Sequence, residues 1–84
     1  MNKVSVRYRA HLAALTGIKE EVIEAADVEG VLRFLREHYG REVEKTARTM
    51  LITLNGESIL LLRRYKTQLK EGDVVSFFPI CAGG

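Results

Sequence analysis

The stretch Leu69-Lys70-Glu71-Gly72-Asp73-Val74-Val75-Ser76-Phe77-Phe78-Pro79 combines a turn with a short apolar strand close to the end of the chain. Residues 70–73 include the glycine and the aspartate that are typical of turns. Residues 74–78 are β-branched or aromatic apart from one serine, and the proline that follows lacks the N–H of a continuing strand. We therefore predict a turn followed by the last strand, with Val75 and Phe77 facing the core.

Beyond that strand the chain continues as Ile80-Cys81-Ala82-Gly83-Gly84. Glycine loses more backbone freedom on ordering than any other residue and has no side chain to bury, so a Gly-Gly pair packs poorly. A tail without Cβ atoms suits a narrow channel on another protein. We expect residues 80–84 to form a flexible tail that presents the Gly84 carboxylate to a partner. A frayed terminus without function is the alternative.

The first half of the chain predicts two strands and a helix. Strict alternation over Lys3–Arg9 indicates a half-buried strand, and a second strand over 19–25 is close enough to pair with it as an antiparallel hairpin, with 10–17 as a long loop. Asp27 is suited to cap the following helix, and Gly40 to end it. The apolar stripe of this helix comprises Val28, Val31, Leu32, Leu35 and Tyr39.

The second half predicts short strands joined by irregular segments. Residues 41–49 form a polar connector with at most a fragment of helix, and 63–69 form a second link. Met50–Leu54 is rich in strand-forming residues, and Asn55-Gly56 is a strong signal for a tight turn. A short strand over Ser58–Leu61 is expected to follow.

These elements predict an α+β fold, in which a mixed four- to five-stranded sheet packs on one main helix. The length of 84 residues suits one domain over 1–84. We expect the last strand to lie in the middle of the sheet, parallel to the first. The tail then leaves one end of the sheet and points into solvent.

Composition and charge exclude several classes of protein. A net charge of +2 is too small to indicate a nucleic-acid partner, and one cysteine allows no internal disulfide. The apolar run over 59–62 is far too short for a membrane span, and the first residues do not resemble a signal peptide. His11 and His38 lack partners at metal-ligand spacing. We therefore expect a cytoplasmic protein without nucleic-acid or membrane partners, metal or active site of its own.

The segment 69–79 resembles the closing Leu-x-x-Gly-Asp-x-Val-x-Phe-x-Pro segment of the ubiquitin-like β-grasp sulfur carriers. It is most similar to the small subunit of molybdopterin synthase (MoaD) and more distantly to the thiamine sulfur carrier (ThiS). Leu54-Asn55-Gly56 matches the strand-and-turn signature of this family, and the opening strand followed by 10–17 is similar to its start. The resemblance covers essentially the whole chain in order and includes Gly83-Gly84.

The resemblance implies chemistry at the Gly84 carboxylate. An adenylating enzyme of the ubiquitin-activating type (MoeB/ThiF-like) would use ATP and magnesium to convert this carboxylate to an acyl-adenylate. A sulfide equivalent would then give a thiocarboxylate, which donates sulfur to a pterin precursor held by the large synthase subunit (MoaE-like). The chain itself would be a non-catalytic subunit that binds no cofactor directly.

The resemblance places the partner contacts at the end of the last strand and along the tail, on Phe78, Pro79, Ile80, Cys81, Ala82 and Gly83. Simple packing is the alternative for Phe78, whereas Cys81 is either a small apolar residue or a thiol that exchanges with a partner. The family usually has a second proline where Ile80 stands, a small residue or valine at Cys81, and an aromatic residue where Arg9 stands. The basic cluster Arg63, Arg64, Lys66 and Lys70 is either solvated surface or complementary to an acidic groove on a partner.

Three other functions remain open. A ubiquitin-like modifier would use the same activation but join Gly84 to lysines of target proteins. A sulfur carrier for thiamine or cysteine synthesis would differ only in the acceptor of the sulfur. A purely structural module with an incidental Gly-Gly tail is the third alternative.

Overall fold

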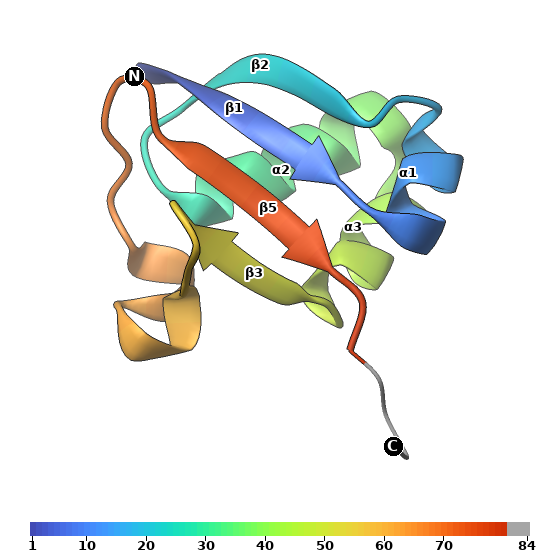
Figure 1. Ribbon diagram of the computed structural model, residues 1–84. Coiled ribbons are helices and arrows are strands. Elements are labelled where there is room, and N and C mark those ends of the chain that lie inside the picture. Colours follow the sequence, from blue (N-terminus) through green and yellow to red (C-terminus); the bar gives the residue numbers. More distant parts are fainter. Residues whose placement is uncertain (81–84) are drawn as a thin grey trace.

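Within residues 1–80, which the computed structural model describes, five strands form one mixed sheet. Their order across the sheet is β2 (Glu20–Ala25), β1 (Asn2–Tyr8), β5 (Val74–Phe78), β3 (Leu51–Leu54) and β4 (Glu57–Ser58). The central strand β5 is parallel to β1 and antiparallel to β3 (Figure 1). The predicted fold class and the predicted central position of the last strand are therefore confirmed.

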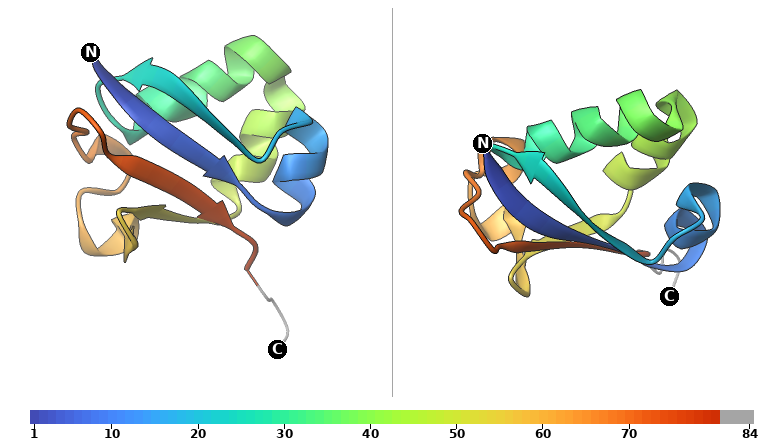
Figure 2. Two further views of the ribbon diagram at one scale, coloured as in Figure 1. Left: turned by 45° about the horizontal axis from the view of Figure 1, so that its top comes forward. Right: turned by 90° about the horizontal axis from the view of Figure 1, so that it is seen from above.

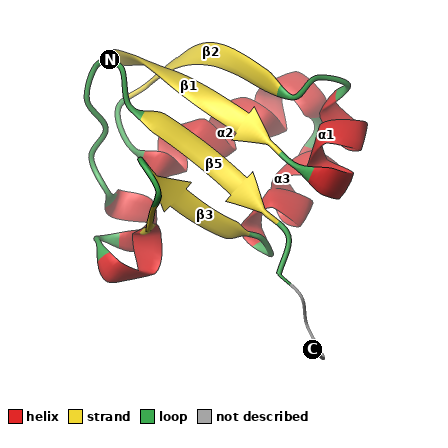
Figure 3. Ribbon diagram, in the orientation of Figure 1, coloured by secondary structure: helices red, strands yellow, loops and turns green. Residues whose placement is uncertain are grey.

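The α-helices lie on one side of this sheet, as the two views of Figure 2 show. They are α1 (Ala10–Thr16), α2 (Val28–Tyr39) and α3 (Arg41–Arg48). Two short 3₁₀ helices, η1 (Ile59–Leu61) and η2 (Arg64–Lys66), follow β4, which forms one edge of the sheet (Figure 3). The opposite face of the sheet is therefore left without a covering helix, and we call it the outer face.

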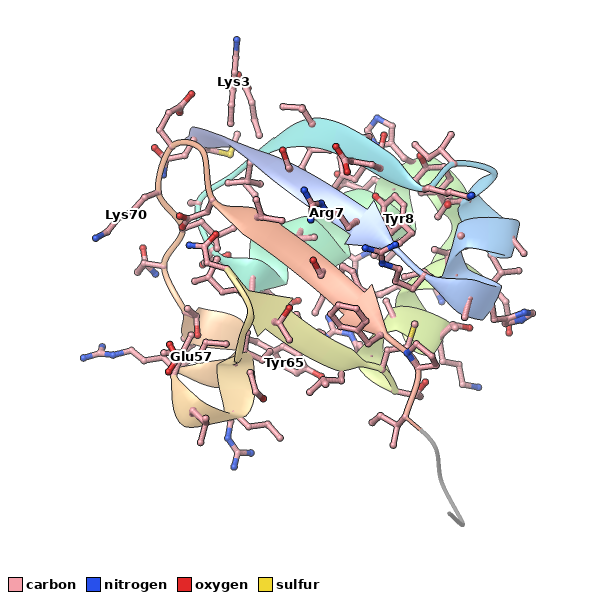
Figure 4. All side chains as sticks on the ribbon, viewed as in Figure 1. Lys3, Arg7, Tyr8, Glu57, Tyr65 and Lys70 are labelled. Atoms are coloured by element: carbon pink, nitrogen blue, oxygen red, sulfur yellow. The ribbon has the colours of Figure 1, made fainter. Side chains whose placement is uncertain are left out.

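The core lies between the helices and the inner face of the sheet. Alternation along β1 turns Tyr8 into the core, where its ring stacks on that of Phe77 with centroids 6.2 Å apart. The next residue toward the N-terminus, Arg7, lies on the outer face (Figure 4). Both aromatic residues are almost completely buried, as are the apolar positions of the α2 stripe except for Tyr39, which is half-buried.

Two of the predicted irregular segments are helical. Residues 10–17 were expected to form a loop, but Ala10–Thr16 is helix α1, which ends at Gly17 in the left-handed conformation. Its three alanines favour helix. The helix has only about two turns and buries only Leu12, so its sequence shows no apolar stripe from which a helix could be predicted. The polar connector likewise contains α3, whose buried residues are Val43 and Ala47.

The short strand expected over Ser58–Leu61 is wrong beyond its first residue. Ile59 turns inward and is buried, and the chain continues as the 3₁₀ helix η1. The hydroxyl oxygen of Ser58 accepts a hydrogen bond from the N–H of Leu60 at 3.2 Å, which starts this turn. The four apolar residues at 59–62 do not alternate with polar residues, so the local sequence pattern could not distinguish a strand from a helical turn.

Gly30 stands early in α2, where a glycine costs up to about 1 kcal/mol relative to alanine. The carboxylate of Asp27 caps the helix by accepting a hydrogen bond from the N–H of Gly30 at 2.8 Å. A Cβ at Gly30 would lie 3.2 Å from that same carboxylate oxygen and 3.5 Å from the Cβ of Ala25. The distance to Ala25 is ordinary contact, so the carboxylate that caps the helix is the group that a side chain at position 30 would crowd.

One carboxylate joins three elements at the edge of the core. Glu21 of β2 accepts hydrogen bonds from the hydroxyls of Tyr8 in β1, at 2.6 Å, and Tyr39 in α2, at 2.7 Å. Burial and this acceptor raise the pKa of Tyr39 to about 12, and they also place the pKa of Tyr8 well above its ordinary value. Both hydroxyls are therefore held in the protonated, donating form.

This arrangement predicts a loss of stability in strong base. Both tyrosines have higher pKa values in the folded state than in the unfolded state, so their contribution is complete below pH ~10. It is lost as the pH rises from about 10 toward 12 and beyond, because only the unfolded chain then releases the protons. Urea unfolding at several pH values should show this fall. Tyr39→Phe should make it shallower, and an unchanged slope in that variant would contradict the assignment.

Candidate functional site

The central strand carries the chain to the end of the sheet where β1 also ends and α1 begins (Figure 1). Phe78 is half-buried at this end, and Pro79 and Ile80 are exposed. We call these three residues the tail root. The other predicted site residues, Cys81, Ala82, Gly83 and Gly84, lie outside the described residues, so their roles stay predictions.

Phe78 lies on the outer face, as alternation with buried Phe77 predicted. It is directly opposite Leu51 of β3. The guanidinium carbon of Arg9 lies 5.9 Å from the centre of its ring, within the range of cation–π contacts. Arg9 thus places a positive charge near the Phe78 ring, so this end of the outer face is both aromatic and basic.

A shallow hollow of about 410 Å³ continues from Phe78 along the outer face. Its floor includes the small side chains of Thr53 and Ser76, which lie opposite one another on β3 and β5. Arg7 and Arg9 line the same hollow, and Arg7 pairs with Glu20 of β2 at 3.1 Å. A partner that docks here would meet a polar floor between an aromatic ring and arginine side chains.

A second hollow of about 390 Å³ lies on the β3 side of the tail root. It is mainly apolar and is lined by Met50, Leu51, Leu60 and Tyr65 together with Ile80. Arg48 stands over the Tyr65 ring at 5.0 Å and is also paired with carboxylates, as described below. We call this the β3 hollow. Sequence reasoning missed it, because its walls come from four separate segments of the chain.

Arg48 joins the helices to the wall of the β3 hollow. Its guanidinium donates hydrogen bonds to Glu29 of α2 at 2.7 Å and to Glu44 of α3 at 2.8 Å. These two hydrogen bonds raise the pKa of Arg48 above its ordinary value, against the opposing effect of burial. The positive charge of Arg48 is therefore already compensated within the chain and is not available to a partner.

The two motifs that carry the family resemblance bind one another at the opposite end of the sheet. The side-chain amide of Asn55 donates to Asp73 at 3.0 Å, and its oxygen accepts from the N–H of Val74 at 2.9 Å. Asp73 also accepts from the N–H of Lys70 at 2.8 Å. Positive φ angles at Asn55 (51°) and Gly56 (87°) form the tight turn that allows this contact. These signature residues therefore hold β3 and β5 together far from the tail root.

No group of three or more His, Cys, Asp or Glu side chains in residues 1–80 is placed to hold a metal ion. None of the described helices is long and apolar enough to cross a membrane. The candidate site in the described part of the chain is therefore the surface around the tail root.

Comparisons with known proteins agree with this geometry. The model of the ThiS family matches residues 6–84. Two solved structures are similar along nearly their whole length. One is the putative molybdopterin converting factor subunit 1 from Pyrococcus furiosus, at 26% identity and a TM-score of 0.75, covering 94% of this chain and 98% of that one. The other is a chain of the complex of subunits 1 and 2 of molybdopterin-converting factor from Helicobacter pylori, at 27% identity and a TM-score of 0.70, covering 98% and 99%.

The small archaeal modifier protein 1 from Methanosarcina acetivorans shares the fold with a TM-score of 0.89, at 24% identity over 100% of this chain and 98% of that one. A comparison with curated proteins gave no match. The family model covers nearly the whole chain, and the β-grasp architecture is that of its structural neighbours. The chain therefore belongs to the ThiS family and is a ubiquitin-like sulfur carrier of the ThiS/MoaD type.

Proposed function

We propose that this chain is the small, sulfur-carrying subunit of a molybdopterin synthase, with Gly84 as the site that carries the sulfur. The observation that supports this proposal most strongly is the likeness to two molybdopterin-converting-factor structures, which extends over 94% or more of every chain compared. The geometry agrees with it, because the exposed tail root lies at the end of the central strand, next to an aromatic and basic surface.

The chemistry proceeds in two steps at one carboxylate group. An oxygen of the Gly84 carboxylate attacks the α-phosphorus of ATP on the adenylating enzyme, and pyrophosphate leaves. A sulfide equivalent then attacks the carbonyl carbon, a C–S bond forms, and the C–O bond to AMP breaks. AMP is a far better leaving group than oxide, so adenylation makes the exchange possible. The resulting thiocarboxylate is a soft nucleophile that can pass its sulfur to a precursor.

The residues of this chain contribute docking and delivery. Phe78 and Arg9 would contact the large synthase subunit or the adenylating enzyme, while the tail enters the pocket of that partner. ATP and magnesium would be bound by the adenylating enzyme, and the pterin precursor by the large subunit.

The proposal is tested by isolating the protein from its native cells and measuring its intact mass. We expect a fraction in which one oxygen at Gly84 is replaced by sulfur, and this fraction should disappear when the adenylating enzyme is absent. Incubation of the loaded protein with the large subunit and the precursor should form molybdopterin. Handling under reducing and non-reducing conditions in parallel separates this mass change from disulfides at Cys81.

Other outcomes of the same experiment would assign a different function to the chain. Lysine-linked conjugates through Gly84, with no sulfur transfer to a pterin precursor, would identify a protein modifier. A thiocarboxylate that is consumed only in thiamine or cysteine synthesis would identify a carrier for that pathway. Either result would leave the family assignment intact and contradict the assignment to molybdopterin synthase.

The docking role of Phe78 gives a separate prediction. Aromatic side chains near the centre of an interface often cost about 2 kcal/mol or more when truncated, which is roughly 30-fold in affinity. We expect Phe78→Ala to weaken binding to the large subunit by about this factor while changing the melting temperature little. Isothermal titration calorimetry and thermal melts check both parts. A large loss of stability with unchanged affinity would show that Phe78 has a packing role instead.

A further inference from the structure

Two adjacent leucines of η1 are unusually exposed for their size. Leu60 and Leu61 have 62% and 75% of their surface accessible, and Ile80 of the tail root has 60%. Single exposed apolar residues are normal on protein surfaces. Here Leu60 and Ile80 line the same β3 hollow, and Leu61 follows Leu60 in the same turn. We call these three residues the leucine patch, and exposed apolar side chains that gather around one hollow are typical of a binding surface.

A basic rim borders the leucine patch. Arg63, Arg64 and Lys66 come soon after η1, beyond Leu62, and are all exposed. No ion pair joins any of the three to a carboxylate within residues 1–80. Arg64 lines the β3 hollow beside Leu60. The surface is therefore complementary to a partner that presents apolar side chains with carboxylates around them.

The place of the patch in the fold identifies the partner. Ile80 belongs to the tail root and also lines the β3 hollow, so a protein that binds the chain at the tail root lies close to the leucine patch. The carrier functions and the modifier function that we considered for the tail all begin with adenylation of Gly84. The adenylating enzyme is thus the one protein that covers this surface in all of them.

We propose that the leucine patch and its basic rim form a second docking site for the adenylating enzyme, which adjoins the surface around Phe78 on the β3 side. This inference rests on the proposed function, because it requires that the tail is activated by such an enzyme. The enzyme would place apolar side chains against Leu60 and Leu61 and acidic side chains opposite Arg63, Arg64 and Lys66. The β3 hollow would receive part of the apolar contact.

The test measures ATP–pyrophosphate exchange by the purified adenylating enzyme of the same organism, with this chain as the varied substrate. Leu60→Ser/Leu61→Ser should raise KM by about tenfold or more, as expected for loss of apolar anchors, while kcat stays within about twofold. The matched control is Val22→Ser, because Val22 is 65% exposed on β2, at the other edge of the sheet. This control should leave both constants unchanged.

The basic rim is tested by charge reversal. Arg63→Glu/Lys66→Glu should also raise KM, and the increase of KM with salt should be lost, because salt screens the attraction between the rim and acidic side chains that these substitutions remove. Lys3→Glu/Arg33→Glu carries the same change of charge on β1 and α2, away from the patch, and should have little effect. Lys3 points away from the molecule at the end of the sheet opposite the tail root (Figure 4).

The outcomes separate this inference from the proposed function. Exchange with the wild-type chain, combined with an unchanged KM for both patch variants, would overturn the docking site and leave the proposed function standing. Absence of any exchange with the wild-type chain would contradict the proposed function itself. Binding of the chain to anionic phospholipid vesicles that depends on Leu60 and Leu61, with normal KM in the variants, would show that the patch contacts a membrane surface instead.

Discussion

Removal of Gly84, or addition of one residue after it, is expected to abolish sulfur loading of this chain. The reacting group in the proposed mechanism is the carboxylate of Gly84, and an added residue converts it to an amide that cannot attack ATP in this way. The tail lies beyond the last strand, so the fold and the melting temperature should not change. Intact-mass measurement after incubation with the adenylating enzyme, ATP, magnesium and sulfide should show loading only for the unaltered protein.

The control for this experiment is one extra residue before Met1. The N-terminus lies at the opposite end of the sheet from the tail root (Figure 1), so this addition should leave loading normal. ATP-dependent loading of the C-terminally extended protein at the wild-type level would contradict the role of Gly84. It would also remove the basis for the proposed function.

The second large effect is expected in the core. Phe77 is fully buried on the central strand and stacks on Tyr8. Truncation of a buried phenylalanine to alanine typically costs about 3–5 kcal/mol, because the lost contacts leave a cavity. The total stability of a small domain is about 5–15 kcal/mol, so Phe77→Ala should be largely unfolded or close to it. Urea unfolding followed by circular dichroism measures this loss.

The neighbouring residue provides the matched comparison. Phe78→Ala removes the same number of atoms one position further along β5, on the outer face, and should keep most of the stability. Phe77→Leu retains much of the buried volume and should lose clearly less stability than Phe77→Ala, so the prediction remains measurable if the alanine variant does not fold. Equal unfolding midpoints for Phe77→Ala and the wild-type protein would contradict the assignment of Phe77 to the core.

Local patterns in the sequence were sufficient for the elements with a clear period. Alternation over Lys3–Arg9 and over residues 74–78 identified β1 and β5 and the faces of their side chains. The stripe along α2 and its Asp27 cap were equally evident, because a twelve-residue helix repeats its apolar face more than three times. By contrast, α1 and η1 are too short to show any period, and both were mispredicted.

The candidate site was predictable only in part. The sequence indicated Gly83-Gly84 and Phe78 as site residues, and their roles stay predictions, but the position of Phe78 on the outer face is confirmed. The contact between Arg9 and Phe78 depends on parallel pairing of β1 with β5, which brings residues almost seventy positions apart side by side. The sequence pattern of a single segment does not show how that segment is aligned with a distant strand. The same is true of the two tyrosine hydroxyls that meet at Glu21.

By itself, then, the sequence determined which strands and which main helix form, which of their faces are apolar, and that a Gly-Gly tail follows the central strand. These features depend on neighbouring residues and on the period of each element. Only the tertiary structure decided what surrounds the tail root. It brought Leu60 next to Ile80, left Arg63 and Lys66 without ion pairs in the described part of the chain, and compensated Arg48 within the chain. The physical reason is that such surfaces form by packing of segments far apart in the chain, and the local sequence of one segment does not show which other segment it will contact.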